Sequence, residues 1–227
     1  MYYDLRNVWF EGFLDFIFNR PVAPQFCEAS WGRDTSPEAC WYDSIDLDID
    51  FDPARNCEYL ALLFSDPLVV RDRYSLSQLE QGFQWMQTSF NDGSAGDILW
   101  TGSLPLGRRV ALIHSMYYLY TDLFAVEPLD RAPRVWWENM ARRIPGCASG
   151  TTWWADRQIV EGALFQTMAS LLELDSENCR IDALRGLAHL AHPGKQGLIL
   201  DYLDRHPGLD ENHRRHAEGA IAGALSE

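Results

Sequence analysis

Acidic and apolar residues alternate along one short stretch of the chain. The members of this stretch are Asp43, Ile45, Asp46, Leu47, Asp48, Ile49, Asp50, Phe51 and Asp52. Spaced carboxylates are ligands that Ca²⁺ and Mg²⁺ prefer. However, the stretch lacks the central glycine and the distal glutamate of an EF-hand loop. Alternation with period two is instead typical of a half-buried strand with one apolar face. We therefore predict one short strand near 45–51 and no metal site.

Two pairs of histidines have a spacing that metal ligands on a helix can use. They are His189-x-x-His192 and His213-x-x-His216. Neither pair contains the glutamate of the zinc-protease pattern. His192 precedes a proline at an expected helix end, where a protonated histidine interacts favourably with the helix dipole. The chain also lacks a nucleophile elbow, a phosphate-binding glycine loop and a dinucleotide fingerprint. We predict no catalytic residue and no cofactor. The open alternative is an enzyme whose site is not marked by any sequence motif and pairs His114 with a carboxylate.

The charge of the chain favours one class of partner. The formal net charge is −14 and the isoelectric point is near 4.7. Such a potential repels nucleic-acid phosphates and attracts a basic protein. The segment 28–58 holds nine acids against two arginines, and two tryptophans flank its acidic part. Exposed tryptophan beside charge is typical of binding hot spots. The predicted partner-binding residues are Trp31, Trp41, Asp43, Asp46, Asp48, Asp50 and Asp52.

Apolar periodicity predicts a predominantly all-α protein. We expect helices over 5–17, 53–66, 76–90, 110–121, 131–144, 153–174, 177–191, 195–206 and 211–225, with a long irregular segment over 20–52. We predict one domain over 1–227, in which 1–150 forms an aromatic-rich part and 151–227 forms helical hairpins. No apolar run could span a membrane, and the residues from Met1 to Arg6 do not read as a secretory signal, so we expect a cytoplasmic protein.

Two pairs of adjacent tryptophans occur in expected helices, Trp136-Trp137 and Trp153-Trp154. Adjacent residues on a helix point about 100° apart, so both rings of a pair rarely bury equally well. One ring of such a pair is therefore a candidate for exposure and partner contact, but core packing is the commoner place for tryptophan and is the outcome we favour.

Two segments near the C-terminus align without a gap at an offset of 34 residues. They cover 179–190 and 213–224, and the matched pairs include Arg180 with Arg214 and Ala183 with Ala217. The region 177–225 resembles HEAT-type helical repeats, which implies an arginine near the start of the first helix and small residues that let the next helix approach closely. Because stacked repeats need about three units for stability, the upstream helices would have to supply further layers.

In overall character the chain is similar to bacterial immunity proteins of polymorphic toxin systems, several of which are small acidic helical binders. This resemblance implies a non-catalytic binding module that docks over a cognate, basic toxin domain. The alternative is a HEAT-like scaffold or adaptor in a bacterial regulatory complex. Neither function needs nucleic-acid binding or a membrane.

Overall fold

The computed structural model describes residues 1–27, 40–42, 47–87, 93–141 and 153–223 of the chain. Its elements, in order, are β1 Tyr2–Asp4, α1 Phe10–Phe18, the 3₁₀ turn η1 Pro24–Phe26, β2 Asp48–Asp50, α2 Pro53–Ser65, α3 Leu68–Arg71, α4 Leu76–Trp85, α5 Ala95–Trp100, α6 Leu106–Tyr118, the π-helix η3 Leu119–Phe124, α7 Arg131–Ala141, α8 Trp153–Leu171, α9 Glu177–His189, α10 Lys195–Arg205 and α11 Glu211–Ala222. The predicted all-α class is therefore confirmed.

The predicted strand is also confirmed, over Asp48–Asp50. It pairs in parallel with β1, in the register Tyr2 with Asp48 and Asp4 with Asp50. The sequence did not predict β1. Three-residue strands carry little periodicity, and the partner lies more than 40 residues away along the chain.

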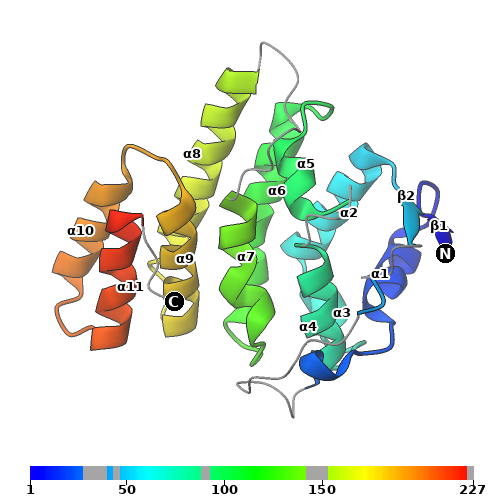
Figure 1. Cartoon of the computed structure of the whole chain (residues 1–227), viewed down its shortest axis with the longest axis horizontal. Coiled ribbons are helices and arrows are strands. Elements are labelled where there is room, and N and C mark those ends of the chain that lie inside the picture. The colour runs from blue at the N-terminus through cyan, green and yellow to red at the C-terminus, as the bar shows by residue number, and fades with distance from the viewer. Residues whose placement is uncertain (28–39, 43–46, 88–92, 142–152, 224–227) are drawn as a thin grey trace.

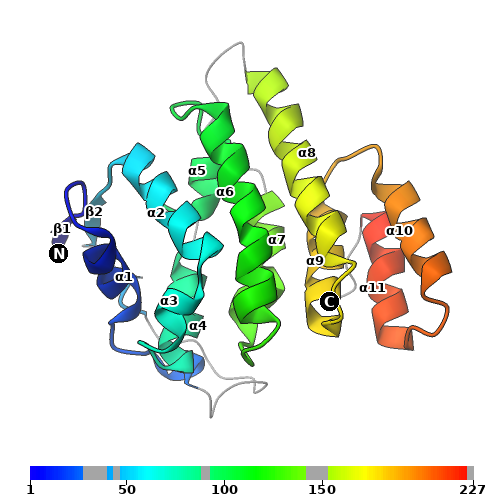
Figure 2. The ribbon, with the colours of Figure 1, turned by 180° about the vertical axis from the view of Figure 1, so that it is seen from behind.

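The longer helices form two layers, and successive helices alternate between the layers (Figures 1 and 2). In one layer α2 packs on α6 and α6 on α8, and α10 follows at the end. In the other layer α4 packs on α7, α7 on α9 and α9 on α11. Helices within a layer run in the same direction, and the two layers run in opposite directions (Figure 1). One cluster of buried apolar side chains extends from Leu5 to Ala220.

Local capping chemistry explains where several of these helices begin. The carboxylate of Asp52 accepts the N–H of Arg55, and Pro53 occupies the first turn of α2. Ser75 and Gln78 form a capping box at the start of α4, which lies within the helix predicted over 76–90. Such caps satisfy backbone donors that have no partner within the helix.

The 34-residue offset of the sequence is reproduced in the C-terminal hairpins. Ser176 caps α9, which begins at Glu177, and Asp210 caps α11, which begins at Glu211. The two helices pack against each other in the same layer. Their equivalent positions in the sequence therefore correspond to equivalent positions in the layer.

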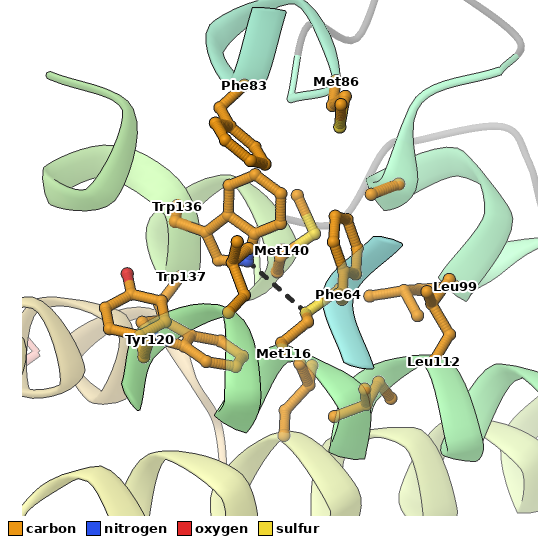
Figure 3. Close-up of a cluster of buried hydrophobic side chains, with 14 of the residues drawn as sticks. Phe64, Phe83, Met86, Leu99, Leu112, Met116, Tyr120, Trp136, Trp137 and Met140 are labelled. Atoms are coloured by element: carbon orange, nitrogen blue, oxygen red, sulfur yellow. Dashed lines mark hydrogen bonds between the residues drawn. The ribbon is translucent and has the colours of Figure 1, made fainter. Parts of the chain in front are cut away.

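Trp136 and Trp137 are both fully buried, so core packing, the commoner place for tryptophan, applies to both rings of this pair. Trp136 contacts Phe64 edge to face and its Nε1–H donates to the Sδ of Met116 at 3.4 Å, whereas Trp137 stacks on Tyr120 (Figure 3). The reason is that α7 has packed neighbours on two sides, α4 and α9. The side chains of Trp136 and Trp137 point about 100° apart around α7, and both therefore pack against neighbouring helices.

Candidate functional site

The structure describes four of the seven predicted partner-binding residues. Trp31, Asp43 and Asp46 lie outside the described residues. Trp41 is half-buried, with its ring centroid 5.4 Å from that of Phe16 and 5.7 Å from that of Trp85. The guanidinium of Arg20 lies 4.5 Å from the centre of the Trp41 ring. These contacts make Trp41 part of the packing under the N-terminal strands.

Asp50 and Asp52 both have structural partners. Asp50 accepts a hydrogen bond of 2.8 Å from the hydroxyl of Tyr2, and its carboxylate lies 3.3 Å from the guanidinium of Arg6. Arg6 also hydrogen-bonds Asp4, and this bond lowers the pKa of Asp4 to about 2. The carboxylate of Asp52 caps α2. Both acids therefore stabilise the ends of local elements as well as contributing charge.

Among the predicted acids that the structure describes, Asp48 has the side chain most available for a partner. It is exposed on β2, and its side chain has no hydrogen bond or ion pair among the described residues. Its backbone N–H is used by the sheet, because it donates to the carbonyl of Met1 at 2.9 Å. A change of the Asp48 side chain should therefore leave the strand pairing intact.

Trp9 is a candidate contact residue that the sequence reasoning missed. Trp9 lies within the helix predicted over 5–17, yet 82% of this residue is exposed. The reason is that α1 begins only at Phe10, so Trp9 is the N-cap residue in extended conformation and lies outside the helical periodicity. Tryptophan is enriched among the residues that dominate protein interfaces, so an exposed ring of this size is a candidate contact residue.

A hollow of about 440 Å³ lies beside this ring. It is lined by Asn7, Val8, Trp9, Arg55, Glu58 and Tyr59. The surface formed by these six residues is called the Trp9 face below. The hydroxyl of Tyr59 donates to the carbonyl of Val8 at 3.0 Å, which ties α2 to the start of α1. Asp50 at the end of β2 lies near this face, because its carboxylate is 3.3 Å from the guanidinium of Arg6, the residue before Asn7.

A second cavity, of about 290 Å³, lies among the first turns of α7, α9 and α11. Asp182 of α9 lines it and is only 7% exposed. Burial raises the pKa of this carboxyl to about 7, although Arg185 and Arg134 act in the opposite direction. His216 lines the cavity from α11, and burial and the nearby Arg185 lower its pKa. This cavity gathers more titratable groups than the Trp9 face does.

The histidines singled out in the sequence have other surroundings. His213 is fully buried, and its Nε2 lies 2.7 Å from the hydroxyl of Tyr202. His192 stacks on Phe165. His114 is exposed, and its Nδ1 lies 3.4 Å from the hydroxyl of Thr167. Neither of the two cavities contains His114, and within the described part of the chain no three His, Cys, Asp or Glu side chains gather at a spacing that would hold a metal ion.

No protein-family model, curated protein or solved structure matches this chain. Among the described residues, no helix is both long and apolar enough to cross a lipid bilayer. Any statement on function therefore depends on the surfaces and cavities themselves.

Proposed function

We propose that this chain is a non-catalytic module that binds a basic protein through the Trp9 face and the adjoining acidic strand. The proposal depends on two exposed groups. Trp9 is 82% exposed and lies beside a hollow, and Asp48 is exposed on β2. Binding energy at protein interfaces concentrates in a few aromatic and arginine side chains that fill pockets on the partner. Trp9 has this character.

The charge of the chain supports a basic partner. A net charge of −14 creates a potential that accelerates encounter with a positive surface and disfavours nucleic acid. The two-layered packing of the helices supports a binding role too, since stacked helical units are rigid and present extended surfaces. A rigid scaffold reduces the entropy that ordering an interface requires.

In its most specific form, the proposal is a cytoplasmic bacterial immunity protein that neutralises a cognate toxin by docking over its active site. This more specific proposal also uses the similarity in overall character between the chain and bacterial immunity proteins of polymorphic toxin systems. The HEAT-like resemblance of residues 177–225 fits a supporting role for the C-terminal hairpins. A scaffold or adaptor would share the binding chemistry but would leave its partner active.

The test is co-expression with the product of the adjacent gene, followed by growth, co-purification and binding kinetics. We expect protection of growth and a salt-sensitive complex. Trp9→Ala should weaken the complex by about 30-fold or more, the size of a hot-spot loss. Asp48→Arg should slow association at low salt and reduce its salt dependence.

Matched control variants lie on α10, at the other end of the long axis (Figure 1). Leu200→Ala removes an exposed apolar side chain and Asp204→Arg reverses an exposed charge there. A complex that is weakened equally by the control variants would argue against the Trp9 face. A stable complex whose partner keeps its toxicity would exclude the immunity role and favour the adaptor. Failure of the adjacent product both to bind and to harm cells would remove the proposal.

A further inference from the structure

The cavity near the start of α9 has a geometry that the proposed docking function does not use. It lies between α7, α9 and α11, which are neighbours in one layer (Figure 1), and the segment Phe124–Asp130 closes one side. At about 290 Å³ it lies at the lower end of the ~300–1,000 Å³ range of small-molecule sites. Its size suits a ligand of a few heavy atoms better than a nucleotide.

Asp182 is an unpaired acid in this cavity. More than nine-tenths of the residue is buried, yet no residue of the described structure gives its carboxylate a hydrogen bond or an ion pair. Buried carboxylates ordinarily accept several hydrogen bonds, because an unpaired charge away from water is unfavourable. A carboxylate of this kind that lines a cavity has unused capacity to bind a cation.

Two guanidinium groups line the same cavity. Arg185 lies one turn after Asp182 on α9 and is half-buried, and Arg134 reaches the cavity from α7. Burial lowers the pKa of Arg185. Among the described residues neither arginine comes within ion-pairing distance of a carboxylate. The cavity therefore presents unpaired positive groups close to an unpaired negative group.

The remaining wall is mixed: Glu127, Asp130, Asn178, Asn212 and His216 are polar, and Glu127 is ion-paired with Arg71. Phe124, Leu129 and Ile181 line the cavity together with two prolines. A ligand that is only cationic would face two guanidinium groups, and a ligand that is only anionic would face the carboxylates of Asp182, Asp130 and Glu127. A ligand that carries both charges a few ångströms apart, with an apolar substituent, satisfies all three features.

We propose that this cavity binds a small zwitterion, namely an α-amino acid with an apolar side chain. Its ammonium group pairs with Asp182, its carboxylate pairs with Arg185 and Arg134, and its side chain contacts Phe124 and Ile181. The site is independent of the Trp9 face, since its ligand needs no protein partner. Its success or failure therefore leaves the docking proposal untouched.

The experiment is isothermal titration of the full chain with three matched probes: L-leucine, N-acetyl-L-leucine and L-leucinamide. The acetyl compound lacks the cation, and the amide lacks the carboxylate. We expect L-leucine to bind and each blocked analogue to bind at least about tenfold more weakly, because each leaves one buried charge unpaired. Equal binding of either analogue would overturn the proposal, as would the absence of heat with leucine, methionine and phenylalanine.

Variants locate the site. Asp182→Asn and Arg185→Gln should each weaken leucine binding by about tenfold or more, whereas Asp204→Asn on α10 should not change it. A thermal melt of each variant shows whether it is folded. Leucine binding that survives both cavity variants would place the ligand elsewhere and refute the inference.

The pH dependence of binding gives a readout that a purely structural role of Asp182 would not give. The ammonium group needs the ionised carboxylate, so with a pKa of about 7 leucine affinity should fall about tenfold from pH 8 to pH 6. The other charged or titratable groups around Asp182 come from the cavity and from the core behind it: Arg134, Arg185, Glu127, Asp130, His216, Tyr120 and Cys179. Burial and the nearby Arg185 lower the pKa of His216. An affinity that is flat over this interval would contradict the assignment.

Discussion

Replacement of Asp182 by asparagine should stabilise the folded protein at alkaline pH, even though it removes a native side chain. Burial raises the pKa of this carboxyl from 3.8 to about 7. A carboxyl whose pKa is higher in the folded state adds stability that is complete below pH 3.8 and is lost as the pH rises to about 7. At 1.36 kcal/mol per pKa unit, the charged Asp182 disfavours folding at pH 8 by roughly 4 kcal/mol, and by under 2 kcal/mol at pH 5.

Asparagine removes this charge, but its buried amide also lacks partners, which costs about 1–3 kcal/mol. The expected net gain is therefore about 1–3 kcal/mol at pH 8 and close to zero, or a small loss, at pH 5. For a chain of this size each kcal/mol corresponds to about 2–4 °C in Tm. The same variant should lose affinity for leucine, so stability and binding should change in opposite directions.

The assay is urea unfolding of the wild-type chain, Asp182→Asn and Asp204→Asn at pH 5 and pH 8. Asp204 is exposed on α10, and its replacement controls for the change of net charge. A gain for Asp182→Asn that is larger at pH 8 by about 2 kcal/mol supports the reasoning. A loss of stability at pH 8, or equal effects at the two pH values, would show that Asp182 has strong partners in the folded state.

Three further changes test how the layers are held together, each by urea unfolding. Gly186→Ala would bring a new Cβ into a clash with the Cβ of Trp137 and should destabilise the chain by about 1–3 kcal/mol. The control Gly197→Ala adds a Cβ in open space and should be neutral or stabilising by up to about 1 kcal/mol. Similar effects of the two variants would mean that α7 and α9 can separate easily. Glu80→Ala removes the acceptor of three backbone N–H groups at the start of α7 and should lower the free energy of unfolding by about 2–4 kcal/mol. The amide hydrogens of these groups should also exchange faster, and unchanged exchange would contradict the capping role. Asp52→Ala removes the cap of α2 and should lower the stability by about 1 kcal/mol, and a neutral result would mean that the cap contributes little.

The positions of most helices follow from chemistry that is local in the sequence. Asp52-Pro53 and the Ser75–Gln78 box mark helix starts through side chains that bond within three residues, so they can be recognised before any tertiary structure is known. The same local chemistry also left one short helix unpredicted. Ser94 belongs to a stretch that reads as a turn, yet it caps the short helix α5.

The candidate contact residues could be predicted only in part, because burial depends on packing between distant elements. The alternation of acids predicts a strand and an exposed Asp48, but nothing near Asp50 in the sequence indicates Tyr2 or Arg6 as its partners. Likewise, Asp182 occupies an ordinary polar position of an amphipathic helix. Its burial becomes visible only when α7 and α11 pack on either side of α9.

The two buried carboxylates among the described residues show why the Asp182 cavity is a functional candidate and not a feature of the core. Both Glu80 and Asp182 pack near the start of α7, and burial raises the pKa of both. Glu80 accepts three backbone N–H groups at 2.7–2.8 Å, so the fold supplies its partners. Asp182 receives none and faces a cavity that holds two unpaired arginines. Proteins violate such local rules chiefly at functional or strained sites. If the fold needed the charge of Asp182, it would supply hydrogen-bond donors as it does for Glu80, so a ligand is the more economical explanation for an acid that the fold itself does not stabilise.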